Sequence, residues 1–459
     1  MSTDRVARAE TSGTTRVVWM ISPDEGDSFA LLGEYDDLRW LALSQHLVRR
    51  GFEVASSLGE GLPSAARPAA VVLNGLNRTA PQAGRLVRRV RSLLPEVPLY
   101  VTGRAAVEVA SAQPPALAVQ AASEDALAVG LLPDGSLSSA TPSMDWWQRL
   151  TPDRSGGPKA PLGVLDVEAT RGCTHACTFC SVGLGPDGYQ RGWAPRAPRE
   201  VAAEVQRWAG DTGASRVQFV DDNFLGSSRE AAAWAREVAV ELRRLVPALR
   251  FSVYARLDPT LLDCLDDLRS AGLVQIHSGV ESASPRMLRI LRKGVSRQTL
   301  DRVYDRVVEH GVEVVPSFIM FDPRAQPADV RDTLDWIRKR DLEAWFTPTT
   351  ALPYAGTVLT EELAGTTPQG SVFLGRDGRP TEPEFAFSSV SVGRALAVAR
   401  ELDAVEGARL SPPLDTLMRI RMRRDAELLC APVDGDADLR TLARHRARQM
   451  ALVAAELEE

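Results

Sequence analysis

The sequence predicts an α/β protein with an N-terminal doubly wound domain, a partial (β/α)6 TIM-type barrel and a C-terminal helical region. Short apolar runs alternate with amphipathic helical stretches along most of the chain, which is typical of parallel sheets covered by helices. A stretch rich in Ser, Pro and Gly, residues 137–161, interrupts the alternation and is expected to link two domains. A chain of 459 residues is also longer than one ordinary domain, so more than one core is expected.

The N-terminal part is expected to form a disordered tail, residues 1–14, and a small doubly wound domain, residues 15–136. Its predicted strands are 16–22, 52–55, 69–74 and 97–102, with helices at 35–51 and 83–94.

Residues 162–357 repeat a strand and a helix about six times, which predicts the barrel. The predicted strands are 163–168, 216–221, 251–256, 274–280, 313–321 and 343–349. The predicted helices between them are 200–208, 229–245, 259–270, 298–310 and 327–339. In such a barrel the reactive centre lies at the carboxyl ends of the strands. Residues 358–459 lose the repeat, and we expect helices that cover the barrel mouth or mediate dimerisation.

The bulk composition argues against some classes of partner. A net charge of −6 gives no basic surface for nucleic acid, and no apolar run is long enough to span a membrane. Because the N-terminus shows no signal-peptide core, a cytoplasmic location is expected.

Three of the five cysteines, Cys173, Cys177 and Cys180, lie within eight residues after the first barrel strand. Thiolates select zinc, copper or iron–sulfur clusters. A structural zinc site needs four ligands, and His175 lies between the cysteines without a finger-like spacing. A [4Fe–4S] cluster on three thiolates leaves one iron open, so this is the favoured interpretation, with zinc or unrelated buried thiols as alternatives. Cys264 and Cys430 are expected to be packing residues.

The C-x3-C-x2-C spacing, with Phe179 before the last cysteine, resembles the cluster loop of the radical S-adenosylmethionine (radical SAM) enzymes. This resemblance covers residues 162–357 and implies that the open iron chelates S-adenosylmethionine. One electron, from a donor such as flavodoxin or ferredoxin, then yields methionine and a 5′-deoxyadenosyl radical.

The same resemblance implies contacts to S-adenosylmethionine at the ends of successive strands. The implied residues are Asp222 for the amino group, Arg256 for the carboxylate, Glu281 and Ser282 for the ribose, and Ile319 for the adenine. The structural alternatives are a helix cap at Asp222, a surface salt bridge at Arg256 and packing at Ile319.

The N-terminal domain resembles the cobalamin-binding domain that precedes the barrel in B12-type radical SAM enzymes. The sequence departs from that family at two turns, Thr102-Gly103-Arg104 and 122–125, where the family has glycine-rich turns. It also has no D-x-H-x-x-G motif, so the cobalamin cofactor is left open.

Side chains two positions apart on a strand share a face, so the lumen of the barrel is expected to be polar. The expected lumen pairs or sets are Glu168 with Asp166, Asp222 with Gln218, Arg256 with Tyr254 and Ser252, and Glu281 with His277 and Gln275. Such a lumen suits a substrate dense in hydroxyl or amine groups, such as a sugar or aminocyclitol. A water-filled structural network is the alternative.

The leading hypothesis is dehydration of a 1,2-diol in an aminoglycoside without cobalamin. In layout the chain resembles the radical SAM diol dehydratases of apramycin biosynthesis. The base would be Glu168, Tyr254 or His277, although a structural role for His277 is the commoner one. The alternatives are a cobalamin-dependent radical SAM C-methyltransferase and a non-catalytic metal-binding protein.

Overall fold

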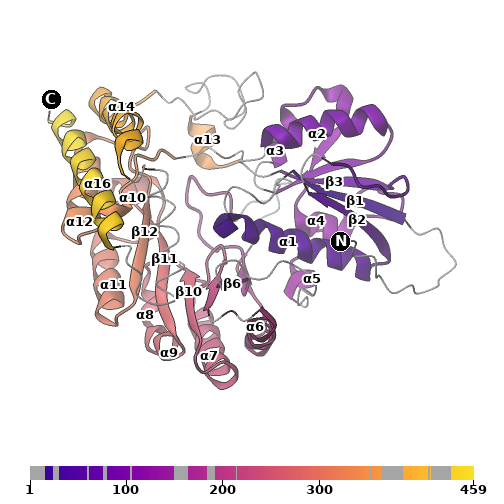
Figure 1. The fold of residues 1–459 in the computed structure, drawn as a ribbon, viewed down its shortest axis with the longest axis horizontal. Coiled ribbons are helices and arrows are strands. Elements are labelled where there is room, and N and C mark those ends of the chain that lie inside the picture. Colours follow the sequence, from indigo (N-terminus) through magenta and orange to yellow (C-terminus); the bar gives the residue numbers. More distant parts are fainter. Residues whose placement is uncertain are drawn as a thin grey trace.

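The computed structural model contains two five-stranded parallel sheets, one in an N-terminal domain and one in a partial barrel (Figure 1). The structure describes residues 16–23, 30–58, 61–75, 80–103, 106–148, 164–182, 192–212, 214, 216–351, 354, 356–363, 386–411, 414 and 436–458. The predicted tail, Cys430 and much of the linker lie outside these residues.

The N-terminal domain has the strand order β2-β1-β3-β4-β5. Its strands are β1 (Arg16–Ser22), β2 (Phe52–Leu58), β3 (Ala70–Asn74), β4 (Leu99–Thr102) and β5 (Val119–Ala121). Its helices are α1 (Ala30–Arg49), α2 (Ala80–Leu93), α3 (Ala106–Ser111) and α4 (Glu124–Gly130). Met20 shares a core with Leu43 of α1, whereas its neighbour Ile21 shares another with Leu86 of α2. Helices therefore cover both faces, and the doubly wound prediction is confirmed, although β5 was not predicted.

A short helix in the linker, α5 (Asp145–Gln148), connects the two domains. The indole of Trp146 donates to Asp125 Oδ1 at 3.0 Å, and both Trp146 and Trp147 are buried in the N-terminal core. On the barrel side, the guanidinium of Arg171 lies 4.5 Å from the centre of the Trp147 ring. The two tryptophans thus lie at the contact between the domains.

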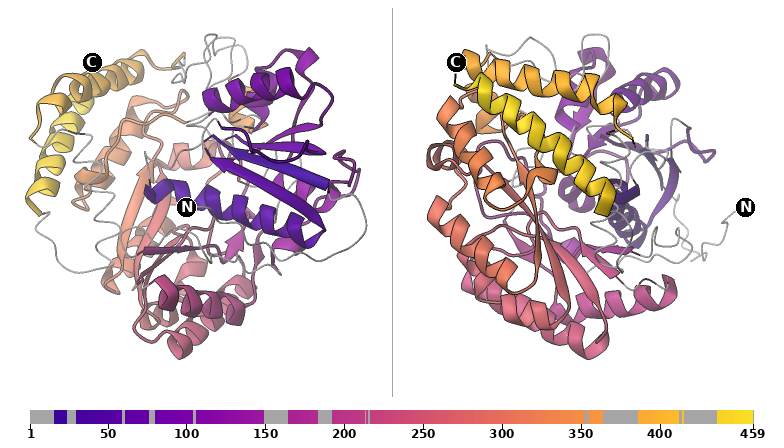
Figure 2. Two further views of the ribbon diagram at one scale, coloured as in Figure 1. Left: turned by 45° about the vertical axis from the view of Figure 1, so that its right-hand side comes forward. Right: turned by 60° about the vertical axis from the view of Figure 1, so that its left-hand side comes forward.

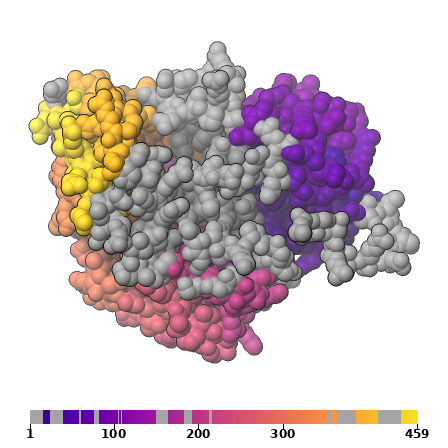
Figure 3. Space-filling model, in the orientation of Figure 1, coloured from indigo at the N-terminus to yellow at the C-terminus, as the bar shows by residue number. Residues whose placement is uncertain are grey.

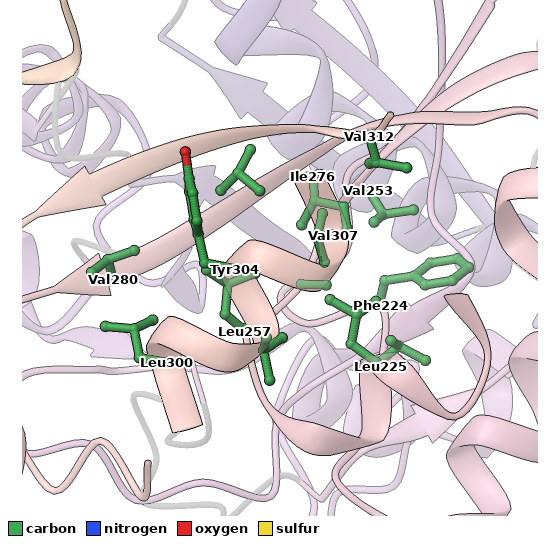
Figure 4. Packing of buried hydrophobic residues seen from close by; sticks show 14 of the residues in the cluster. Phe224, Leu225, Val253, Leu257, Ile276, Val280, Leu300, Tyr304, Val307 and Val312 are labelled. Atoms are coloured by element: carbon green, nitrogen blue, oxygen red, sulfur yellow. The ribbon is translucent and has the colours of Figure 1, made fainter. Parts of the chain in front are cut away.

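The barrel sheet has the order β12-β11-β10-β9-β6, with every pairing parallel. Its strands are β6 (Val164–Val167), β9 (Arg216–Phe219), β10 (Arg250–Tyr254), β11 (Leu273–Glu281) and β12 (Glu313–Phe318). The helices outside it are α6 (Pro198–Thr212), α7 (Arg229–Leu245), α8 (Pro259–Leu262), α9 (Leu265–Ser270), α10 (Pro285–Ile290), α11 (Arg297–Glu309) and α12 (Pro327–Arg338). Between the strands and helices lies an apolar core, in which Val253 and Ile276 meet Val307 of α11 (Figure 4).

The prediction of a sixth barrel strand at residues 343–349 is wrong. A 3-10 helix, η4 (Glu343–Trp345), begins this segment, and an isolated parallel bridge joins Phe321 to Thr350 just beyond it. Pro348 has no N–H to give to a strand ladder, which explains why the aromatic and β-branched residues around it form no strand.

The C-terminal helices α14 (Val390–Val405) and α16 (Asp436–Glu456) pack beside α12 on the outer wall of the barrel (Figure 2). Ala399, Met450 and Val453 join the barrel core. On the face in Figure 3 these helices and the N-terminal domain lie at opposite sides. A third helix, α13 (Val358–Glu362), instead contacts the cysteine loop, since Leu359 N donates to Thr178 O at 2.9 Å.

Candidate functional site

The cysteine loop leaves the carboxyl end of the barrel through a small antiparallel pair, β7 (Thr170–Arg171) and β8 (Ala194–Pro195). Gly172 then turns the chain with a φ of +76°, a left-handed conformation that favours glycine. The loop is fixed at its far side because Thr178 N donates to Leu291 O at 3.1 Å. Cys173, Cys177 and Cys180 are therefore presented together at the end of the barrel where the reactive centre was expected.

Each of the three thiols is free, partly exposed and within reach of at least one hydrogen-bond donor. Asn223 Nδ2 lies 3.8 Å from Cys173 Sγ, and Arg256 Nη1 lies 3.6 Å from Cys177 Sγ. The backbone N–H of Val182 lies 3.4 Å from Cys180 Sγ. Hydrogen bonds to cluster sulfurs are one of the ways in which proteins set the reduction potential of an iron–sulfur cluster.

Burial raises the pKa of the Cys180 thiol to about 11 and also raises the pKa of Cys173. Both thiols are consequently protonated at neutral pH without metal, and binding of iron must displace these protons. Among the described residues, no three His, Cys, Asp or Glu side chains are grouped to hold a single metal ion. The residues fit an iron–sulfur cluster because three thiols on one loop could bind iron. A hydrogen-bond donor also lies beside each of the three sulfurs.

His175 lies between the cysteines in sequence, but its ring is hydrogen-bonded elsewhere. Its Nε2 contacts Ser227 Oγ, which in turn donates to Asp258 Oδ2 at 2.9 Å. Burial, followed by the charge of Arg256, lowers the pKa of His175 to about 4. A neutral imidazole thus ties the cysteine loop to the ends of the neighbouring strands.

Two of the residues expected to bind S-adenosylmethionine, Glu281 and Ile319, lie next to each other. Ile319 N donates to Glu281 O at 2.9 Å, and Glu281 has a φ of +65°, which is uncommon for a non-glycine residue. Its carboxylate pairs with Lys293 Nζ at 3.2 Å, and the carbonyl of Lys293 accepts from Arg256 Nη2. Lys293 therefore connects Glu281 with Arg256, a role that the sequence analysis missed.

The other two residues expected to contact S-adenosylmethionine lie in different surroundings. Ser282 Oγ is 3.0 Å from Thr333 Oγ1 of α12, because it points to the opposite face from Glu281. Asp222 Oδ2 accepts from Gly172 N at 3.1 Å and from Arg39 Nη2 of α1 at 2.7 Å. Asp222 thus supports the turn into the cysteine loop.

The three residues expected to act as bases, Glu168, Tyr254 and His277, lie in two different surroundings. The rings of Tyr254 and His277 stack with centroids 4.8 Å apart, and Gln218 Nε2 donates to the Tyr254 hydroxyl at 3.2 Å. Glu168 instead forms ion pairs, with Arg39 Nε at 3.0 Å and with Arg171 Nη2 at 2.8 Å.

A row of polar residues crosses the inner face of the barrel sheet. In the strand register each of the following pairs with the next: Asp166, Gln218, Ser252, Gln275 and Glu313. Val253 and Ile276, their neighbours in sequence, belong to the apolar core on the other face. Ser252 Oγ and Gln275 Oε1 are buried and have no hydrogen-bond partner among the described residues. The prediction that alternate residues of the barrel strands form a polar inner face is confirmed.

At the carboxyl edge of the N-terminal sheet, the turns that follow β3 and β4 approach each other closely. In a sheet of order 2-1-3-4-5, ligands bind outside the carboxyl ends of the strands near β1 and β3. Gly103 has a φ of +90°, and a Cβ there would lie 2.8 Å from Gly75 O and 2.9 Å from Asn74 Oδ1. Thr102 Oγ1 is buried there without a partner among the described residues. Small residues and an unsatisfied hydroxyl fit the approach of a cofactor such as cobalamin.

His46, the histidine of α1, is a packing residue. Its Nε2 lies 3.1 Å from Ala128 O, and its ring contacts Trp146. Burial lowers its pKa, so the ring is neutral at pH 7.

The partial barrel and the cysteine loop together are the features expected of a radical SAM domain. Residues 167–337 match the family model described as "Radical SAM superfamily", so this part of the chain is a radical SAM domain, which implies a [4Fe–4S] cluster and S-adenosylmethionine as its cofactors.

An uncharacterized methyltransferase of Pyrococcus horikoshii is 27% identical over 203 residues, which cover 44% of this chain and 42% of that protein. The chain thus aligns with less than half of the length of this curated relative.

Two solved structures share the fold. The cobalamin-dependent S-adenosylmethionine radical enzyme OxsB, with aqua-cobalamin and S-adenosylmethionine bound, superposes with a TM-score of 0.69 at 14% identity, over 95% of this chain and 72% of that one. The radical S-adenosylmethionine methyltransferase TsrM from Kitasatospora setae, with cobalamin and a [4Fe–4S] cluster bound, gives a TM-score of 0.56 at 16% identity, over 77% of this chain and 75% of that one.

Proposed function

We propose that this protein is a cobalamin-dependent radical SAM C-methyltransferase that acts on a polar small molecule. The observation that carries the proposal is the carboxyl edge of the N-terminal sheet, where Gly103 lies against Gly75 and the buried Thr102 hydroxyl lacks a partner among the described residues. A relative named as a methyltransferase, and solved cobalamin proteins of the same fold, support it.

Methyl transfer replaces the dehydration that the sequence analysis favoured. The named relative is a methyltransferase, and no comparison supports a dehydratase or an aminoglycoside substrate. The lyase assignment is therefore set aside in favour of the alternative.

The cysteine loop would hold the cluster through Cys173, Cys177 and Cys180, and the edge of the N-terminal sheet would hold cobalamin. When bound, the cluster would supply the electron that cleaves S-adenosylmethionine, and cobalamin would carry the methyl group. Arg256 and Asn223 donate toward two of the sulfurs and so stabilise negative charge on them. Lys293 holds the Glu281 carboxylate at the end of β11, where a ribose could be received.

The polarity of the substrate is proposed from the lumen. Ser252 Oγ and Gln275 Oε1 are buried polar atoms that need hydrogen-bond partners, from water or from a substrate. The stacked Tyr254 and His277 lie two residues further toward the carboxyl ends of the same strands. They would orient hydroxyl or amine groups of the substrate. A flavodoxin or ferredoxin would deliver the electron.

The experiment is an anaerobic incubation of cobalamin-loaded protein with candidate polar substrates, a strong reductant and methyl-deuterated S-adenosylmethionine. The proposal predicts S-adenosylhomocysteine, 5′-deoxyadenosine and a deuteromethylated product together. Cleavage to 5′-deoxyadenosine and methionine alone, by protein that retains no cobalamin, would contradict it.

A further inference from the structure

A buried group of four charges joins the N-terminal domain to the start of the cysteine loop. It consists of Arg39 on α1 and of Glu168, Arg171 and Asp222 in the barrel. We propose that Arg39 is a positioning residue through which the docked N-terminal domain sets the electrostatic environment of the cluster. This inference requires the cluster but neither cobalamin nor methyl transfer.

Arg39 reaches two carboxylates at once. Its Nε lies 3.0 Å from Glu168 Oε1, and its Nη2 lies 2.7 Å from Asp222 Oδ2. The exposed fractions of these side chains are 13% for Arg39, 6% for Glu168 and 2% for Asp222, so water screens the pairs only weakly. A planar guanidinium can bridge two carboxylates in this way, whereas a lysine ammonium cannot hold the same fork.

Asp222 carries the contact to the cluster loop. The carboxylate oxygen that pairs with Arg39, Oδ2, also accepts from the backbone N–H of Gly172, the residue before Cys173. Asn223, the next residue along the chain, reaches Cys173 Sγ. Loss of Arg39 would therefore remove a cation from beside the Asp222 carboxylate, which contacts the residue that precedes a cluster ligand.

Arg171 makes a second contact between the same two parts of the molecule. Its guanidinium lies over the ring of Trp147 at 4.5 Å and pairs with the second oxygen of Glu168. Arg39 of the N-terminal domain thus contacts Glu168 and Asp222, and Trp147 of the linker contacts Arg171, which pairs with Glu168. These four charges sum to zero, and removal of Arg39 leaves a net charge of −1 among them.

The sign of the effect follows from charge alone. Reduction adds an electron to the cluster, so a nearby cation favours the reduced state and an uncompensated anion disfavours it. R39Q should lower the fraction of cluster that is reduced at a fixed potential. D222N in the R39Q background should restore it, because it removes the charge that R39Q exposes.

The test is an anaerobic redox titration, with the reduced cluster quantified by electron paramagnetic resonance in variants matched for iron and sulfide. At the potential where half of the wild-type cluster is reduced, we expect the ratio of reduced to oxidised cluster to fall at least threefold in R39Q. R49Q, on an exposed arginine of the same helix, should leave it unchanged, and R39Q/D222N should return it toward wild type.

Equal ratios in R39Q and R49Q would overturn the proposal, as would a loss in R39Q that D222N does not reverse. A docking residue without electrostatic influence would give the first of these results. If R39Q does not yield folded protein, D222N alone is compared with wild type. D222N removes a negative charge beside the cluster loop and should raise the ratio, and an unchanged ratio would overturn the proposal. Because the readout is spectroscopic, it stays informative even if no methyl transfer occurs.

Discussion

Lys293 holds the Glu281 carboxylate in place, and K293M tests the importance of that pair. The ammonium lies 3.2 Å from Glu281 Oε1, with 8% and 12% of the two side chains exposed. Removing one partner of a buried pair generally costs about 3–5 kcal/mol, because the other charge stays buried without compensation. Since about a tenth of this pair is exposed, we expect K293M to lower the free energy of unfolding by about 2–3 kcal/mol.

The assay is urea unfolding of K293M at pH 7, followed by circular dichroism. Lys339, an exposed residue that follows the last residue of α12, supplies the matched control K339M, which should unfold like wild type. E281Q in the K293M background should recover much of the loss, because no charge is then left buried. A K293M loss below about 0.5 kcal/mol, the range typical of surface substitutions, would refute the reasoning. A loss that E281Q does not relieve would refute it as well.

Three further predictions concern other parts of the site. Y254F removes the hydroxyl that accepts from Gln218; product formation should fall at least about tenfold while S-adenosylmethionine cleavage persists, and equal losses of both would argue against a role toward substrate. G103V should abolish cobalamin retention, measured by absorption, with iron content unchanged, because its side chain would meet Gly75 and Asn74; retained cobalamin would place the cofactor elsewhere. Burial raises the pKa of Asp221 well above its usual value, so its contribution to stability is present at low pH and is lost as pH rises through that raised pKa; D221N should flatten this dependence in unfolding experiments, and parallel profiles would show that Asp221 is ionised throughout.

Much of the barrel and its lumen could be predicted because both depend on local periodicity. Alternation placed Gln218, Ser252 and Gln275 on one face, and the strand register aligns them across the sheet. The same rule separates Ser282 from Glu281, so the sequence already contained the reason for its turn toward Thr333.

Other features of the fold and of the candidate site could not be predicted, because they depend on contacts that no local sequence pattern encodes. Arg39 meets Glu168 across 129 positions of sequence and Asp222 across 183, and nothing near Arg39 signals those partners. Lys293 carried a weak signal, as one of three lysines among 54 basic residues. β5 is only three residues long and is fixed by its pairing with β4. The false sixth strand followed from reading aromatic and β-branched residues without giving weight to Pro348.

The most direct test of the account is the metal content of anaerobically reconstituted protein, compared with the C177A variant. The account predicts about four irons and four acid-labile sulfides per wild-type chain, and a cluster spectrum that changes when S-adenosylmethionine is added. C177A should lose the cluster, whereas C264A, on a buried thiol outside the loop, should keep it. A wild-type chain that carries zinc and no sulfide, or a spectrum indifferent to S-adenosylmethionine, would contradict it.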